Sequence, residues 1–168
     1  MIGLVAAGAM LLIAIAAQAA PSGSQKALPI NIQANNANFT QKSGVSTYTG
    51  NVSMIRGGLT LTGDKLVVTR ANKNSPVQAV LTGSPAHIDR KPDASDNQRV
   101  TGHAHRIEYT NGTSVITLRG NAVVNRGGDQ IQGAVITHDV DTGQTHAERG
   151  SGQDDRVHIT IQPGDGTP

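Results

Sequence analysis

The chain repeats itself at an offset of 70 residues, and this repeat constrains the fold more than any other feature. Without gaps, residues 33–69 align with residues 103–139, with ten identities in 37 positions. Self-similarity at a fixed spacing is typical of a structural unit that is built twice. The identical residues are mainly turn and bend formers, among them Gly50 over Gly120, Asn51 over Asn121, Arg56-Gly57-Gly58 over Arg126-Gly127-Gly128, and Gly63 over Gly133.

Five further aligned positions keep apolar character although their residues differ. Both halves therefore place bulky apolar side chains at equivalent pleat positions, which indicates one face of a sheet. Gly63 and Gly133 lie between the last two of these positions, where we expect a bend or bulge that changes the inward face. The five pairs are Phe39 with Tyr109, Tyr48 with Leu118, Met54 with Val124, Leu61 with Ile131, and Leu66 with Ile136.

Short alternating stretches separated by turn signals run through the chain from Lys26 onward. Apolar residues spaced by two, such as Ile30 and Ile32 or Ile107 and Tyr109, are typical of strands. Glycine-containing turns supply the positive φ that tight hairpins require. We therefore expect an all-β fold with a dozen or more short strands, the last of them near residues 157–161.

The N-terminal segment has a different character. Residues 1–19 form an uncharged apolar run with Ala17 and Ala19 at the −3 and −1 positions of an A-x-A cleavage signal. Gln18 interrupts the run, which makes it a poor match to a spanning helix. We therefore expect a signal peptide at 1–19, a β-domain at 20–163 and a disordered tail at 164–168, with an uncleaved membrane anchor as the alternative for the first segment.

Composition and motifs exclude several functional classes. The chain has no Cys, and its net charge of +2 without a Lys or Arg cluster lacks the electrostatic footprint of a nucleic-acid-binding protein. It contains no G-x-S-x-G, P-loop or H-E-x-x-H motif. His103 and His105 are expected on one strand face, but zinc needs three or four convergent ligands. We expect no catalytic residue, no cofactor, no metal site and no nucleic-acid partner.

The supply of core residues is small. With one Phe, two Tyr and no Trp, a β-sandwich must fill its interior with Val, Ile, Leu and Thr. Such an interior is either a thin packed core or a partly empty binding cavity. A groove of small aliphatic groups suits an acyl chain, since burial contributes about 25 cal/mol per Å² of apolar area. Composition leaves both possibilities open.

Several motifs, taken in their order, carry a family resemblance. Residues 47–52 (TYTGNV), the turn Arg56-Gly57-Gly58 and residues 61–70 (LTGDKLVVTR) resemble the OstA-like domain of the lipopolysaccharide transport proteins. Residues 118–122 (LRGNA) repeat the first motif in the second half. Residues 28–34, 84–88 and 102–104 extend the resemblance over nearly all of the chain after the signal segment.

The resemblance implies an open twisted β-jellyroll whose two facing antiparallel sheets hold the acyl chains of lipid A between them. It implies a non-enzymatic periplasmic carrier whose copies join head to tail through open edge strands, between an inner-membrane donor and an outer-membrane acceptor. The strand at Ile30 and Ile32 would then lie at one end and the last strand at the other. By parity and resemblance, the expected lipid-binding wall is Ile30, Ile32, Phe39, Tyr48, Met54, Leu61, Ile88, Tyr109, Leu118 and Ile131.

Other interpretations of the sequence stay open. An anchored subunit of the same pathway would retain the apolar N-terminus. A structural β-repeat protein would have a merely packed interior, and a lipid-modifying or glycan-modifying jellyroll would need a catalytic constellation. Basic residues near loop ends could contact lipid phosphates or merely aid solubility; they are Arg70, Lys73, Arg90, Lys91, Arg99 and Arg106.

Overall fold

The structure, a computed structural model, describes residues 28–72, 74–92, 97–139, 142–152 and 155–163. The expected signal peptide and C-terminal tail lie outside these residues. Within them, no helix has the length and hydropathy needed to cross a membrane. The strands are β1 (Asn31–Gln33), β2 (Asn36–Thr40), β3 (Val45–Arg56), β4 (Leu59–Thr69), β5 (Gln78–Arg90), β6 (Val100–Thr110), β7 (Val115–Arg126), β8 (Asp129–Asp139), β9 (Thr145–Glu148) and β10 (His158–Thr160).

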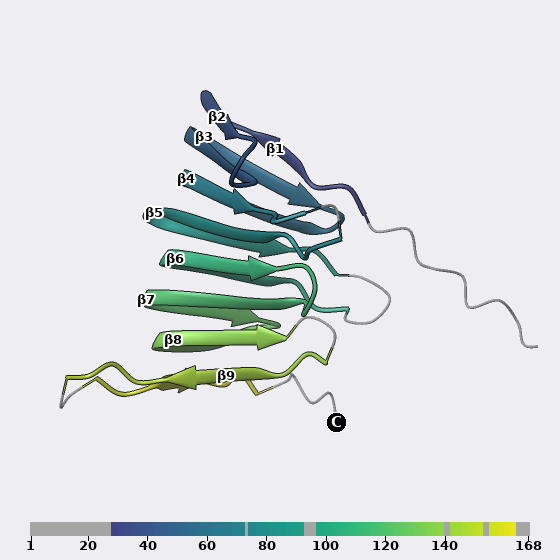
Figure 1. Cartoon of the computed structure of the whole chain (residues 1–168). Coiled ribbons are helices and arrows are strands. Elements are labelled where there is room, and N and C mark those ends of the chain that lie inside the picture. Colours follow the sequence, from purple (N-terminus) through teal and green to yellow (C-terminus); the bar gives the residue numbers. More distant parts are fainter. Residues whose placement is uncertain (1–27, 73, 93–96, 140–141, 153–154, 164–168) are drawn as a thin grey trace, which may run out of the picture.

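All ten strands belong to one antiparallel ladder that runs in sequence order. The order is β1-β3-β4-β5-β6-β7-β8-β10, with β2 also paired to β3 and β9 also paired to β8. Figure 1 shows the resulting stack, with the N-terminal strands at one end and the C-terminal strands at the other. Each long strand is paired on both of its sides, so among the described residues only the short terminal strands present free edges.

A line of β-bulges folds this ladder into two layers. The register shifts between Thr49 and Val52 in β3 and again between Arg119 and Ala122 in β7, 70 residues further on. At both places a Gly-Asn pair has positive φ, +80° and +45° at Gly50 and Asn51. Positive φ is costly for residues with a Cβ, so the repeated Gly-Asn pair marks where each strand turns from one layer to the other.

The two layers can be defined by their paired segments. The first layer contains β1, β10 and the segments 52–56, 59–63, 86–90, 100–103, 122–126 and 129–133. The second layer contains β2, β9 and the segments 45–49, 65–69, 78–82, 106–110, 115–119 and 135–139.

The repeat predicted from the sequence is present in the fold. Strands β3 and β7 begin and end 70 residues apart, and the same holds for β4 and β8. The all-β prediction is confirmed, but the expected dozen or more short strands is wrong for the described residues. Six of the ten strands are 11 to 13 residues long, since a bulge lets a strand bend and continue instead of ending.

Candidate functional site: the apolar interior and its rims

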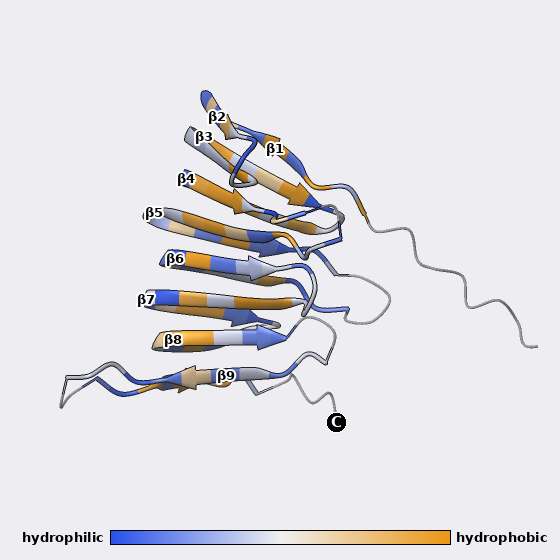
Figure 2. Cartoon of the chain, in the orientation of Figure 1, coloured by the Kyte–Doolittle hydropathy of each residue, from blue (hydrophilic) through white to orange (hydrophobic). Residues whose placement is uncertain are grey.

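Two rows of inward-facing residues cross the whole molecule. In the first layer the cross-strand partners form the row Ile32, Met54, Leu61, Ile88, Gly102, Val124, Ile131 and Ile159. In the second layer they form the row Ala37, Tyr48, Leu66, Leu81, Ile107, Leu118, Ile136 and Ala147. Every strand thus contributes to an apolar row, and Figure 2 shows hydrophobic segments alternating with polar ones along the strands.

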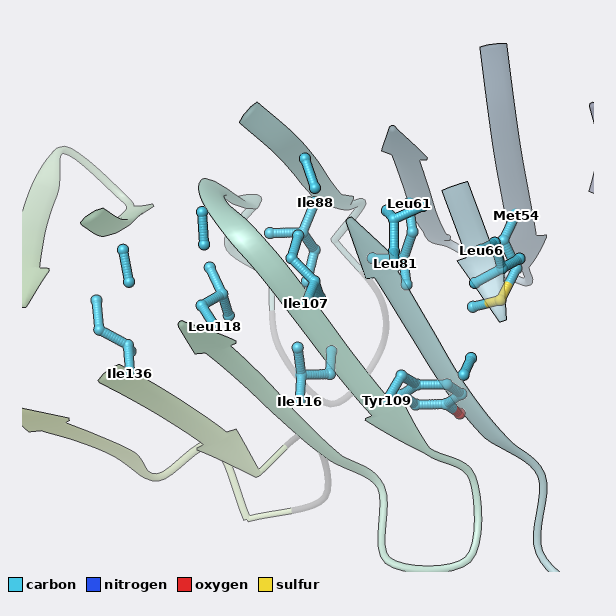
Figure 3. Packing of buried hydrophobic residues seen from close by; sticks show 14 of the residues in the cluster. Met54, Leu61, Leu66, Leu81, Ile88, Ile107, Tyr109, Ile116, Leu118 and Ile136 are labelled. Carbon is cyan, nitrogen blue, oxygen red and sulfur yellow. The ribbon is translucent and has the colours of Figure 1, made fainter. Parts of the chain in front are cut away.

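The side chains of the two rows meet and close the centre of the interior. Met54, Leu61, Leu66, Leu81 and Ile107 are completely buried. Figure 3 shows these side chains gathered between the strands. A cavity of about 260 Å³ remains between the layers near Val124 and Ile131 of the first layer and His138 of the second. This cavity is smaller than the pockets of about 300–1,000 Å³ that hold drug-sized ligands, and the side chains around it are packed against one another.

Nine of the ten residues predicted to line a groove lie in or against this core. Met54, Leu61, Ile88, Tyr109 and Leu118 are buried members of it, while Ile30, Ile32, Tyr48 and Ile131 are partly buried and pack against it. Phe39 differs, because β2 is the terminal strand of its layer. Its ring is 64% exposed and makes an edge-to-face contact with Tyr48, with the ring centroids 5.8 Å apart.

Apolar side chains are exposed at both ends of the stack. Phe39 lies at the N-terminal end, and Ile159 and Ile161 lie at the C-terminal end, with 60% and 71% of their surface exposed. Exposed large apolar residues at unpaired edges are typical of surfaces that pair with another chain. The strands near Ile30 and near residues 157–161 therefore form the two ends, as the sequence predicts.

A row that contains three arginines and one aspartate borders the interior of the first layer. Arg56, Leu59, Arg90, Val100, Arg126 and Asp129 are successive cross-strand partners. Arg56 Nη1 donates a hydrogen bond to the Tyr109 hydroxyl of the second layer, and its guanidinium lies 5.8 Å from the Tyr109 ring centroid. Arg90 is 5% exposed. From the sequence, Arg56 and Arg126 are interpreted only as turn residues. Their recurrence 70 residues apart is the signal that could have identified them as residues at the border of the interior.

The histidines do not assemble a metal centre. His103 and His105 flank Ala104, which is buried in the core, so both lie on the side of β6 that faces away from the interior, as predicted. His103 is the cross-strand partner of His87, with ring centroids 6.0 Å apart. Among the residues that the structure describes, no three His, Asp or Glu side chains lie close enough to hold a metal ion.

An ion pair on the outer face links β5 to the residue that precedes β6. Arg99 Nε donates a 2.8 Å hydrogen bond to Asp89 Oδ1, and its Nη2 contacts the other carboxylate oxygen. This hydrogen bond lowers the pKa of Asp89 below its usual value. The carboxylate and the guanidinium both face away from the interior, so the pair belongs to the solvated surface.

Facing layers, a continuous apolar interior and free edge strands at both ends define an open-ended β-jellyroll. The chain belongs to the LptA/(LptD N-terminal domain) LPS transport protein family, whose model matches residues 31–144. It is an LptA-like protein of lipopolysaccharide export.

Individual relatives agree with this family. Lipopolysaccharide export system protein LptA of Haemophilus influenzae is 32% identical over 137 residues, covering 80% of this chain and 77% of that protein. LptH of Pseudomonas aeruginosa is 30% identical over 146 residues, covering 83% and 82%. The crystal structure of LptH, described as the LptA homologous periplasmic component of the lipopolysaccharide transport device, matches with a TM-score of 0.73 at 28% identity. The match covers 81% of this chain and 96% of that structure.

Proposed function

We propose that this protein is a non-enzymatic periplasmic carrier that binds lipopolysaccharide and shields the lipid A acyl chains between its two layers. The observation that carries the proposal is the pair of apolar rows, which extend through every strand from one free edge to the other. An apolar path of this kind lets acyl chains move along it while sugars and phosphates stay in water. The lipopolysaccharide export proteins among its relatives support the choice of ligand.

The packing of the two rows sets a requirement for binding. In the middle of the stack the inward side chains of both rows are buried against one another, so we infer that the layers separate when lipid enters. Only three aromatic residues are present in the chain, and the core consists mainly of aliphatic side chains. Acyl chains replace the contacts that these side chains lose, which keeps the free-energy cost of opening low. We infer that Ile30, Ile32, Tyr48, Met54, Leu61, Ile88, Tyr109, Leu118 and Ile131 contact the lipid, together with Phe39 at the rim.

The internal repeat supplies a template for head-to-tail assembly. Within the chain, Ile88 of β5 pairs with Gly102 of β6. Leu61 and Ile131 are equivalent in the repeat. Ile88 pairs with Leu61 and Ile159 pairs with Ile131, so Ile159 occupies the position at the C-terminal end that Ile88 occupies within the chain. Ile32 aligns with Gly102 at the offset of 70. We therefore place Ile159 of one copy opposite Ile32 of the next, which continues the first apolar row across the junction.

The partners follow from the same edges. A bridge of such copies needs two partners with compatible edges. The donor is an LptC-like protein of the inner membrane, and the acceptor is an LptD-like protein of the outer membrane. The match to a family that includes the LptD N-terminal domain supports the acceptor, since related jellyrolls present related edges. An LptC-like anchored role is the second candidate, favoured only by the apolar run at residues 1–19. Sequencing the N-terminus of the exported protein separates these two roles.

Photocrosslinking to lipopolysaccharide tests the carrier function. A photoreactive residue replaces Tyr48 or Ile88, which face the interior, and a matched control carries it at Thr49, the outward-facing neighbour of Tyr48. We expect lipid adducts at the two inward positions and none at the control. A folded protein that gives no adduct at any position has a closed interior, and the structural β-repeat interpretation would replace the carrier.

A further inference from the structure

The Tyr109 ring occupies a site between the two layers in the first half of the molecule. Tyr109 is 2% exposed, and the Arg56 guanidinium of the first layer lies 5.8 Å from its ring centroid. In the second layer, Ala79 of β5 is the cross-strand neighbour of Tyr109, and Val68 of β4 is the neighbour of Ala79. The ring therefore fills a space that residues from both layers border.

The internal repeat carries the surroundings of this ring to the C-terminal end of the stack. His138 aligns with Val68 at the offset of 70, and Thr145 pairs with His138 as Ala79 pairs with Val68. The equivalent pairs are Arg56 with Arg126, Val68 with His138, and Ala79 with Thr145. All three residues of the second half line the cavity of about 260 Å³. This cavity is therefore the counterpart of the Tyr109 site without an aromatic ring.

The strand that would supply the ring lies at the other end of the molecule. Tyr109 belongs to β6, which pairs with β5. In the second layer β9 takes the place of β5, and among the described residues no strand pairs with its other edge. The residue that aligns with Tyr109 is Phe39 of β2. A second copy that adds its β2 to the free edge of β9 would place its Phe39 opposite Thr145, as Tyr109 lies opposite Ala79.

The ring and the cavity match in chemistry and size. Phe39 is 64% exposed, and it faces the interior side because its ring contacts Tyr48, which packs against the core. Val124 and Ile131 give the cavity an apolar wall. A cavity of about 150 Å³ can hold benzene, so the free space is sufficient for one phenyl ring. Arg126 has an interaction of its own, so we place the ring against the apolar wall.

We propose that this cavity is a docking site for Phe39 of the next copy, whose ring completes the interior at the junction. The inference rests on the head-to-tail assembly of the proposed function. The docked ring also fixes the register of the junction. A slip by one residue would turn Phe39 outward, and a slip by two would carry the ring past Thr145.

Fluorine NMR tests whether the ring is covered at the junction. Phe39 is the single Phe of the chain, so para-fluorophenylalanine gives a signal from this position alone. Copies are linked through Ile32→Cys and Ile159→Cys, and the linked dimers are isolated. Each dimer has one Phe39 at the junction and one at its free end. We expect two signals of equal intensity, of which only one is broadened by a paramagnetic agent in the solvent.

A variant that fills the cavity tests where the ring docks. Val124→Met adds atoms to the cavity wall, and Val123→Met is the matched control on the neighbouring position, which faces outward. We expect Val124→Met to expose the junction ring to the paramagnetic agent and Val123→Met to leave it protected. Circular dichroism establishes that both variants are folded. The measurement on the unmodified cavity does not depend on either variant.

Sedimentation of the exported protein without added cysteines measures the effect on assembly. We expect Phe39→Ala to raise the concentration at which half of the copies are associated by at least about tenfold, because a buried aromatic anchor is lost. Ile55→Ala is the control, since Ile55 is also exposed and apolar but lies on the outer face next to the buried Met54. Ile55→Ala should associate as the native protein does.

The possible failures are distinguishable. If linked dimers form and both rings stay accessible to the agent, or if Phe39→Ala associates as the native protein does, the docking site is wrong and the head-to-tail assembly stands. A junction ring that stays protected in Val124→Met lies elsewhere, which overturns the assignment to the cavity. If the native protein does not associate and the cysteines do not link, the assembly and the docking site both fail.

Discussion

Leu118 of the second layer fills the space that Gly102 leaves open in the first. A Cβ built on Gly102 would lie 3.4 Å from Leu118 Cδ2 and 2.5 Å from the backbone oxygen of Val123. Gly102 is also the one member of the first apolar row without a side chain. The two layers therefore come into contact at Gly102 and Leu118, near the middle of the stack.

This contact predicts that Gly102→Ala destabilises the fold. A methyl group at 2.5 Å from a backbone oxygen forces the strand to shift, at a cost of about 1–3 kcal/mol in the free energy of unfolding. Gly58→Ala is the control, since a Cβ there meets its nearest atom at 3.5 Å, an ordinary contact. Urea unfolding followed by circular dichroism measures both variants. Equal midpoints for the two would contradict the close approach of the β7 backbone to Gly102.

The proposed carrier function predicts that Ile30→Asp abolishes lipid binding. Ile30 is partly buried against the core, so the carboxylate would face acyl chains and lose hydration without gaining a partner. Asn31→Asp is the matched control on the neighbouring exposed position. Binding of fluorescent lipopolysaccharide by the folded variants is the measurement. If Ile30→Asp binds lipid as the native protein does, Ile30 is not part of the binding wall.

The head-to-tail register predicts a specific disulfide between copies. Cysteines at Ile32 and Ile159 should form an intermolecular bond on oxidation, because directly opposite residues on paired strands bring their Cβ atoms within about 4.5–5.5 Å. The native chain has no Cys, so no native thiol can form a competing disulfide. A variant with cysteines at Phe39 and Ile159 is the control, since those residues belong to different layers. On non-reducing gels, a ladder of disulfide-linked oligomers is expected from the Ile32 and Ile159 variant alone. Such a ladder from both variants would contradict the proposed register.

The Asp89–Arg99 pair predicts a pH-dependent contribution to stability. Arg99 lowers the pKa of Asp89 in the folded protein, so the pair stabilises the fold above the ordinary pKa of aspartate, about 3.9. This stabilisation is lost as the pH falls through the lowered pKa and the carboxylate takes up a proton. Arg99→Gln should therefore be less stable than the native protein at neutral pH, by a small amount because both groups are exposed.

The measurement is urea unfolding of the native protein and Arg99→Gln across this pH range. The difference between the two should shrink as the pH falls below about 4. High salt at neutral pH should reduce it as well, because exposed charges are screened. A difference that grows on acidification would contradict the assigned direction of the Asp89 pKa.

The sequence by itself determined which residues face inward. Alternation and the offset of 70 identified the apolar positions, since the strand period and the repeated turn residues are local properties. Met54 and Leu61 are buried where this pattern places them. The family resemblance, carried by ordered motifs, added the jellyroll and the transport pathway.

Only the tertiary structure decided which inward positions are covered. Phe39 and Tyr109 are equivalent in the repeat, yet Tyr109 is 2% exposed and Phe39 is 64% exposed. Ile88 and Ile159 hold equivalent register positions, with exposures of 5% and 60%. A residue in the middle of the stack has strands on both sides, whereas a residue at an end has a strand on one side only. Burial therefore depends on a strand's place in the assembled ladder, which no local pattern records.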